Sequence, residues 1–177
     1  MIINSTKFEG LFEIENKKIE DCRGSFVKIF HQELFEEYGL VTEFKESFYS
    51  VSKKNVLRGM HFQLPPHDHA KLVYVVEGEI LDVVVDVREN SKTYGQFFST
   101  NLTSENTKSL YISKGFAHGF LTLSDSATVV YQTSTVHAPK FDAGIKWDSF
   151  DFEWGIKNPV ISDRDMRLPG LKKATAN

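Results

Sequence analysis

Short stretches in which apolar and polar residues alternate recur along most of the chain. Glycine, proline, asparagine and serine separate them, and this combination is typical of an all-β domain. The predicted strands are residues 11–15, 25–30, 46–52, 56–62, 71–78, 79–88, 95–102, 109–113, 119–123, 128–135 and 144–150. A short helix is predicted at 31–39, where Gly39 ends it. So many short strands indicate a closed barrel or a jelly roll.

The stretch 79–88, EILDVVVDVR, alternates most clearly. One face of a strand here carries Leu81, Val83, Val85 and Val87. The other face carries Asp82, Val84, Asp86 and Arg88, and a parallel strand buried on both sides would not tolerate it. We expect Asp82 and Asp86 to be hydrogen-bonded residues of the barrel wall without a catalytic role.

Length and charge narrow the class of protein. A chain of 177 residues favours a single domain, here 1–177, with a polar and flexible tail at 172–177. The formal net charge of −3 does not favour nucleic-acid binding. Cys22 is the single cysteine, which excludes a disulfide framework and a thiolate metal site. With no apolar run of membrane-spanning length and no secretory pattern at the N-terminus, we expect a cytoplasmic protein that does not contact a membrane.

Glycines punctuate the middle of the chain and separate two segments that each bear a histidine, RGMHFQ at 58–63 and GFAHGF at 115–120. Their spacing resembles the two motifs of the cupin superfamily, whose metal-binding members take His-x-His and Glu from the first motif and His from the second. Only His61 and His118 remain of those four ligands, because Gln63 replaces the second histidine and Lys71 lies near the position of the glutamate. Two imidazoles alone bind a metal weakly, and a lysine repels a cation. We therefore expect the barrel without a metal.

Longer motifs resemble one family within that superfamily. They are residues 56–63, 71–95, 112–120, 129–135, 144–149 and 161–171. In order, spacing and content they resemble the dTDP-4-dehydrorhamnose 3,5-epimerase family from about residue 9 to residue 171. The resemblance implies an all-β, cupin-type double-stranded jelly roll with short peripheral helices. It also implies a homodimer that needs no cofactor and acts on nucleotide-linked 4-keto-6-deoxy sugars.

The chemistry of such a substrate asks for particular residue types. A ketone at C4 acidifies the protons on C3 and C5, so a base can remove one of them to give an enolate. A proton returned to the opposite face of the ring then inverts the centre. The reaction needs a base, a proton donor across the ring and a positive group beside the developing oxyanion.

The resemblance supplies candidates for each role. It implies that His61 is the base, Tyr131 the acid and Lys71 the cation beside the C4 oxygen. Asp165 would orient His61, although Asp163 in the same SDRD motif competes for this role. The substrate-binding residues that it implies are Arg23, Phe26, Lys28, Glu46, Phe48, Arg58, Gln63, His118, His137 and Arg164. Among them, Arg23 and Arg58 would hold the diphosphate, which planar bidentate donors suit.

Several positions depart from the family pattern and leave the substrate open. His137 stands where a second aromatic residue is common, and Glu46 and Phe48 stand where Gln and Asn are usual. Lys28 replaces a customary glutamate. The nucleotide (dTDP, GDP or CDP), the sugar (hexose or heptose) and the centres inverted (C3, C5 or both) therefore stay undecided, and a non-catalytic sugar-nucleotide-binding cupin is a further alternative.

Two expectations concern segments around this core. His67 and His69 follow two prolines in an expected loop, and we interpret them as surface or rim residues.

The segments 11–15 and 23–30 precede the barrel motifs and have no evident pairing inside the barrel. We expect these N-terminal strands to cross to a partner subunit, since an exchanged edge covers exposed strand backbone.

Overall fold

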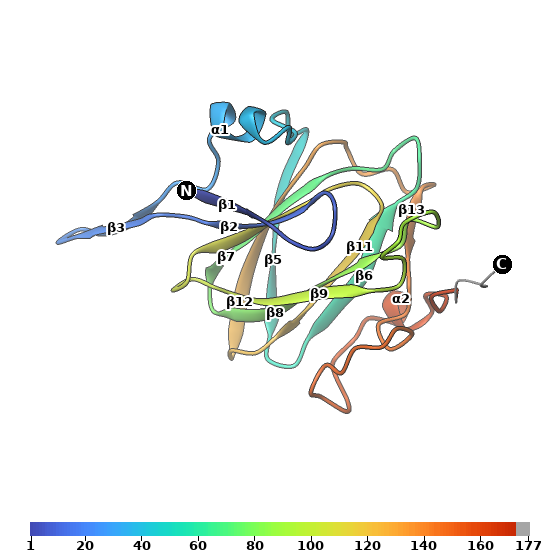
Figure 1. Cartoon of the computed structure of the whole chain (residues 1–177). Coiled ribbons are helices and arrows are strands. Elements are labelled where there is room, and N and C mark those ends of the chain that lie inside the picture. Colours follow the sequence, from blue (N-terminus) through green and yellow to red (C-terminus); the bar gives the residue numbers. More distant parts are fainter. Residues whose placement is uncertain (173–177) are drawn as a thin grey trace.

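Two antiparallel sheets face each other in the computed structural model of the chain, which describes residues 1–172 (Figure 1). The first sheet has the order β1 (Ile2–Ser5), β2 (Leu11–Glu15), β10 (Lys108–Ile112), β7 (Lys71–Glu77), β12 (Ser126–Thr133), β5 (Glu46–Lys53). The second has the order β13 (Asp142–Gly144), β6 (Leu57–Gln63), β11 (Phe116–Thr122), β8 (Glu79–Asp86), β9 (Phe97–Thr103). This arrangement confirms the predicted all-β jelly roll.

The helices are short and peripheral, as predicted. They are α1 (Gln32–Glu37) and α2 (Asp163–Met166). Gly39 follows α1 with a φ of +68°, in the left-handed region that glycine adopts readily. Neither helix in the described part of the chain is long and apolar enough to cross a membrane.

Hydrophobic packing occupies three layers. Between the sheets lie inward-facing residues such as Val73, Val84 and Val129. Across the outer face of the five-stranded sheet lies the C-terminal segment, with Trp154 in the buried cluster. Helix α1 covers part of the outer face of the six-stranded sheet, where Phe35 is fully buried. Both sheets are therefore covered on both faces over much of their area.

Two predicted strands end at least three residues earlier in the structure than predicted. Residues 144–150 were expected to form a strand, but β13 ends at Gly144. Beyond it, Ile145 and Trp147 pack on the outer face of the five-stranded sheet, so burial rather than alternation places them. The strand expected at 25–30 ends at Val27, and the next apolar residues pack beneath α1.

Of the tail expected at 172–177, residues 173–177 lie outside the described residues.

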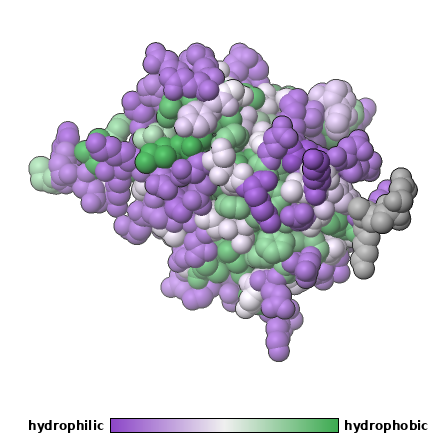
Figure 2. Space-filling model, in the orientation of Figure 1, coloured by the Kyte–Doolittle hydropathy of each residue, from purple (hydrophilic) through white to green (hydrophobic). Residues whose placement is uncertain are grey.

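The N-terminal region is partly paired within the chain. β2 lies between β1 and β10, so the expectation that residues 11–15 lack an internal partner is wrong. In contrast, β3 (Lys18–Asp21) and β4 (Gly24–Val27) pair only with each other within residues 1–172 and project as a hairpin (Figure 1). Figure 2 shows hydrophobic side chains among the hydrophilic ones along this projection. The exchange of N-terminal strands with a partner subunit therefore stays a prediction, and it now concerns the β3–β4 hairpin.

β8 carries two aspartates into the space between the sheets. Asp82 and Asp86 are both 0% exposed. Asp86 accepts hydrogen bonds from Arg88, Ser91 and Thr93, which together satisfy both of its oxygens. Burial alone would raise the pKa of Asp86, but these donors hold it down at about 2.

Asp86 should stabilise the fold only where it is ionised. Its pKa is about 2 in the folded protein and about 4 in an unfolded chain, which corresponds to roughly 2–3 kcal/mol of stability above pH ~4. That contribution is lost as the pH falls from about 4 to about 2. Asp86→Asn should lower the free energy of unfolding in urea by about this amount at neutral pH and flatten its pH dependence between pH ~4 and ~2. If the free energy of unfolding of Asp86→Asn varied with pH as it does in the wild type, the dependence would come from other carboxylates.

Candidate active site

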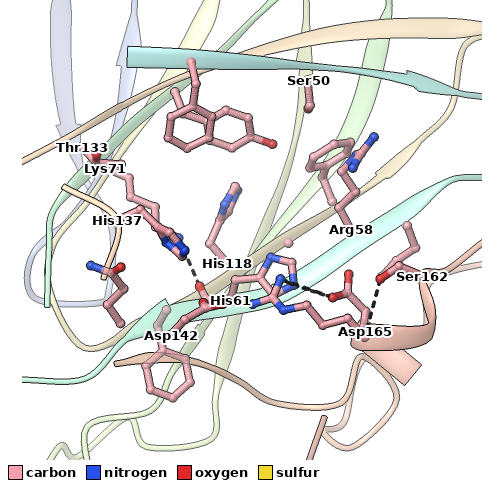
Figure 3. Close-up of a pocket in the computed structure, with 18 of the residues that line it drawn as sticks. Ser50, Arg58, His61, Lys71, His118, Thr133, His137, Asp142, Ser162 and Asp165 are labelled. Carbon is pink, nitrogen blue, oxygen red and sulfur yellow. Dashed lines mark hydrogen bonds and ion pairs between the residues drawn. The ribbon is translucent and has the colours of Figure 1, made fainter. Parts of the chain in front are cut away.

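A cavity of about 560 Å³ lies between the two sheets (Figure 3). β5, β6, β7, β11 and β12 line it together with the segment 160–165. Its size lies within the range of small-molecule sites in proteins. The predicted residues that line it are Phe48, Arg58, His61, Gln63, Lys71, His118, Tyr131, His137, Arg164 and Asp165. The fold thus brings most of the predicted site together.

An irregularity in β6 turns Arg58 and His61 toward the same cavity. In a regular strand these two residues, three positions apart, would lie on opposite faces. The pairing of β6 with β11 shifts between these positions, so that β6 has an extra residue there. Gly59 occupies the shift with a φ of +138°, where other residue types are strained. A Cβ atom on Gly59 would also lie 2.5 Å from the Cα of Gly119 in β11, so the close approach of the two strands depends on glycine.

Asp165 holds the imidazole of His61. Nε2 of His61 is 2.7 Å from Oδ1 of Asp165, while the amide of Gly59 donates to Oδ2 at 3.2 Å. Burial alone would raise the pKa of the Asp165 carboxyl, but His61, the Gly59 amide and the charge of Arg164 hold it below its usual range. An ionised carboxylate only accepts hydrogen bonds, so Nε2 of His61 carries the hydrogen. Nδ1 is then the atom left to accept a proton.

The same helix turn supplies a guanidinium beside this pair. Nη1 of Arg164 is 3.3 Å from Nε2 of His61 and 3.7 Å from Oδ1 of Asp165. Nη2 donates to Asp142 at the start of β13, which fastens α2 to the edge of the five-stranded sheet. The Arg164 side chain is 49% exposed, so it can reach a ligand at the mouth of the cavity.

Lys71 lies on the opposite sheet, at the start of β7. Its Nζ donates to the backbone carbonyl of His61 at 3.1 Å. Burial lowers the pKa of Lys71 to about 8, and the charges of Asp82 and Asp142 oppose this effect. At neutral pH the ammonium group is therefore mostly charged and suited to stabilise a negative oxygen in the cavity.

Tyr131 also belongs to the six-stranded sheet, on β12 beside β7. Its ring stacks on that of Phe48, with the ring centroids 4.9 Å apart and the planes 17° from parallel. Burial raises the pKa of Tyr131 well above its ordinary value, and the Ser50 hydroxyl offsets this only in part. The phenol is thus neutral at physiological pH and available as a proton donor.

A second histidine–aspartate pair lies next to the first. His118 faces His61 across the β6–β11 register, and its Nε2 is 2.8 Å from Oδ2 of Asp82. Oδ1 of Asp82 is buried without a hydrogen-bond partner within residues 1–172. The prediction that Asp82 is a fully hydrogen-bonded wall residue is therefore wrong for one of its two oxygens.

Four predicted binding residues do not line the cavity. Arg23 pairs with Asp21 in the projecting hairpin, and Phe26 on the same hairpin is 60% exposed. Lys28, just after the hairpin, borders a different cavity near α1. Glu46 lies beside the site, where its carboxylate accepts from the amide of His137 at 3.1 Å.

The structure adds lining residues that the sequence analysis does not identify. Ser50 and Thr133 lie two positions from Phe48 and Tyr131 on the same strands, so period-two alternation could have found them. Nothing local in the sequence marks Asp142. His69, expected at the surface or rim, lines the cavity, and burial together with the charges of Lys71 and His137 lowers its pKa to about 4.

Gln63, at the position of the second histidine ligand of metal-binding cupins, binds two backbone groups. Gln63 donates from Nε2 to the carbonyl of His67, and its Oε1 accepts from the amide of Ala138. It thus fastens two loops at the edge of the cavity. In the described part of the chain, no group of three or more His, Cys, Asp or Glu side chains is arranged to hold a metal ion.

Known proteins resemble this chain over nearly its whole length. The family model for dTDP-4-dehydrorhamnose 3,5-epimerase matches residues 5–173. The dTDP-4-dehydrorhamnose 3,5-epimerase of Shigella flexneri is 42% identical over 94% of this chain and 93% of its own. The Bacillus anthracis enzyme, solved with TDP and PPi bound, matches with a TM-score of 0.92 and 32% identity over 96% of this chain and 99% of its own. ChmJ, a 3′-monoepimerase from Streptomyces bikiniensis solved with dTDP-quinovose, matches with a TM-score of 0.87 and 31% identity over 95% and 87%.

The two carboxylates should fix the tautomers of their histidines. Nitrogen-15 NMR of histidine-labelled protein at alkaline pH should show His61 and His118 with the hydrogen on Nε2, because each Nε2 contacts a carboxylate oxygen. Asp165→Ala should turn the His61 signal into a mixture of tautomers and leave that of His118 unchanged. A wild-type His61 protonated on Nδ1 would contradict the assignment.

Proposed function

The chain belongs to the dTDP-4-dehydrorhamnose 3,5-epimerase family, and we propose that it inverts C3 and C5 of a nucleotide-linked 4-keto-6-deoxy sugar by proton transfer between His61 and Tyr131. The observation that carries the proposal is the position of these two residues on opposite walls of one cavity, on β6 and β12 of the two facing sheets. A sugar ring bound between the sheets presents one face to each wall. Inversion requires a base on one face and an acid on the other.

The proton path follows from the contacts of each group. Nδ1 of His61 removes the proton from C5 or C3, while Asp165 stabilises the imidazolium that forms. The electron pair moves to the C4 oxygen, and the charge of Lys71 stabilises the resulting enolate. Tyr131, kept neutral by burial that raises its pKa, returns a proton to the opposite face. The enolate collapses to the ketone with the centre inverted.

A second candidate function is inversion of one centre only. It is supported by the similarity to a 3′-monoepimerase and by His137, which stands beside the cavity where the family commonly has an aromatic residue. The two candidates share the base, the acid and the enolate. They differ in how far the bound sugar lets each carbon approach His61.

Solvent exchange separates the roles of the two residues. In heavy water with a dTDP-linked 4-keto-6-deoxyglucose, His61→Asn should reduce both deuterium uptake at C3 and C5 and epimerised product by about 10²–10⁴-fold, the usual cost of losing a general base. Tyr131→Phe should retain deuterium uptake, because the enolate still forms, while inverted product falls. Proton NMR of each carbon follows both quantities in one sample.

The controls discriminate between the alternatives. GDP- and CDP-linked substrates run beside the dTDP sugar test the nucleotide, and uptake confined to one carbon in the wild type would establish a single-centre epimerase. A wild type that binds these sugars without any exchange would identify a non-catalytic binding protein. Exchange that persists in His61→Asn but stops in Tyr131→Phe would reverse the two assignments.

We also propose that the β3–β4 hairpin completes the cavity of a partner subunit in a homodimer. Arg23 and Phe26 lie on this hairpin, away from the cavity of their own chain. Phe26 and Ile19 are 60% and 51% exposed, which is unusual for large apolar side chains without a partner. Seated on a second copy, they would be buried and could reach the nucleotide bound there.

Subunit mixing tests the shared site. Sedimentation at micromolar concentration should give a dimer. Arg23→Ala combined with Phe26→Ala should lose activity, as should His61→Asn. Refolding the two inactive chains together should recover about a quarter of the wild-type activity, because half of the dimers would be mixed and each would have one complete site. A monomer, or no recovery from a mixture shown to contain mixed dimers, would reject the shared site.

A further inference from the structure

We infer that Asp82 is a positioning residue for this site: through its buried carboxylate it fixes His118 and supplies the counter-charge that keeps Lys71 a cation. The inference rests on the proposed function, in which Lys71 stabilises the enolate. Figure 3 shows His118 and Lys71 projecting into the same space as His61. Asp82 lies behind them on β8, the strand next to β11.

The surroundings of Asp82 leave one of its two carboxylate oxygens without a partner within residues 1–172. The residue is 0% exposed. Oδ2 is 2.8 Å from Nε2 of His118, while Oδ1 has no hydrogen-bond partner within the described residues. The contact with His118 thus satisfies one of the two oxygens and leaves the other without a partner in this part of the chain. A buried carboxylate is costly unless a cation lies near enough to balance it.

Lys71 is the group that meets this requirement. It lies on the inner face of the facing sheet, where burial lowers its pKa to about 8, and Asp82 is the first of the two carboxylates that oppose this shift. Asp142 is the second, but it also forms an ion pair with Arg164. Asp82 has no arginine or lysine bonded to it within residues 1–172, and its charge acts on Lys71, on the hydrogen-bonded His118 and, behind the larger effect of burial, on Tyr131.

Other ionisable groups face Lys71 from the surrounding elements. From β6, β11 and the loops come the imidazoles of His61, His118, His69 and His137. From β12, β6 and α2 come Tyr131, Arg58, Arg164 and Asp165. Of these, Asp165 is held by His61, and the arginines and imidazoles add no negative charge. The carboxylates that favour the charged form of Lys71 are thus Asp82 and Asp142.

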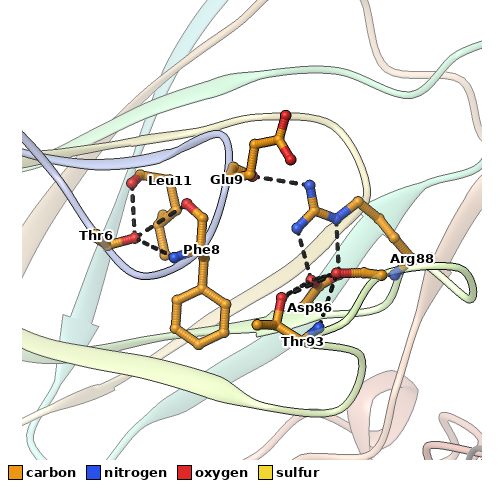
Figure 4. Close-up of polar contacts among 8 residues, drawn as sticks. Thr6, Phe8, Glu9, Leu11, Asp86, Arg88 and Thr93 are labelled. Atoms are coloured by element: carbon orange, nitrogen blue, oxygen red, sulfur yellow. Dashed lines mark hydrogen bonds and ion pairs between the residues drawn. The ribbon is translucent and has the colours of Figure 1, made fainter.

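Asp86 provides a matched control on the same strand. It lies four residues from Asp82, shares its face of β8 and is equally buried. Figure 4 shows Asp86 among Arg88 and Thr93, with Arg88 also reaching the backbone of Glu9. This group ties the N-terminal loop to the end of β8, and Asp86 is not among the residues that line the cavity. Asp86 is therefore structural, whereas Asp82 acts on the site.

The first measurement is the pH profile of turnover. The wild type should lose kcat as the pH rises through the pKa of Lys71, near 8. Asp82→Asn keeps the size of the side chain and an oxygen that accepts from His118 but removes the charge. It should move this alkaline limb down by about one pH unit, with kcat falling about fivefold at pH ~8 and KM nearly unchanged. Asp86→Asn should lower stability and leave the alkaline limb in place.

The second measurement does not depend on turnover. Competitive acetylation with acetic anhydride, read by mass spectrometry, reports the pH at which Lys71 loses its proton. This midpoint should move down in Asp82→Asn and not in Asp86→Asn. If the wild type turned over no 4-keto sugar, the proposed function would fail while the labelling still tested the coupling of Asp82 to Lys71.

Two outcomes would overturn the inference. One is an Asp82→Asn protein whose Lys71 midpoint equals that of the wild type. The other is an Asp86→Asn protein whose Lys71 midpoint shifts as far as that of Asp82→Asn. This would mean that removing either buried carboxylate of β8 disturbs the site. Should Asp82→Asn not fold, the double variant Lys71→Gln, Asp82→Asn removes both charges. Its folding would support the coupling, and its failure to fold would give Asp82 a purely structural role.

Discussion

The burial of ionisable side chains between two apolar sheets is the constraint on which the rest of this structure depends. Asp82 and Asp86 are 0% exposed, and Asp165 is 3% exposed. A buried carboxylate is tolerated only beside donors or cations, so each one is joined to a different element. Asp86 joins β8 to Arg88 and the loop that follows, Asp82 joins β8 to β11, and Asp165 joins α2 to β6. The pairs that stabilise the charges therefore also fix the positions of the site residues.

The site divides between the two sheets in a way that suits a reaction with opposite faces. The five-stranded sheet supplies His61 and His118, and the six-stranded sheet supplies Lys71 and Tyr131. The close approach of β6 and β11 at Gly59 brings the two imidazoles side by side. The C-terminal segment, which covers the outer face of the five-stranded sheet with aromatic residues, ends in the turn that presents Asp165. The same packing that hides this sheet from water thus positions the carboxylate that contacts His61.

Three of the four residues by which the chain departs from the expected family pattern lie near one another, namely Glu46, Phe48 and His137, whereas Lys28 lies near α1. Phe48 stacks on the ring of Tyr131, and Glu46 accepts from the amide of His137. These residues come from β5 and from the segment after β12, and β5 pairs directly with β12. Apart from Lys28, the departures therefore lie on the Tyr131 side of the cavity, away from the His61–Asp165 pair.

The sequence by itself determined the fold class, because period-two alternation is a local property that survives in the folded chain, and its resemblance to the family indicated most of the residues that line the cavity. Alternation placed strands at 46–52, 71–78 and 79–88, and the resemblance supplied the candidates for a base, an acid and a cation. Only the tertiary structure decided how they meet. The shift at Gly59 puts Arg58 and His61 on one face, which alternation alone forbids, and the wrapping of the C-terminal segment brings Asp165, already favoured over Asp163 by the motif, into contact with His61. The unsatisfied oxygen of Asp82, the entry of Asp142 and His69 into the lining, and the hairpin that carries Arg23 away from it follow from contacts between distant segments. No pattern of neighbouring residues encodes such contacts.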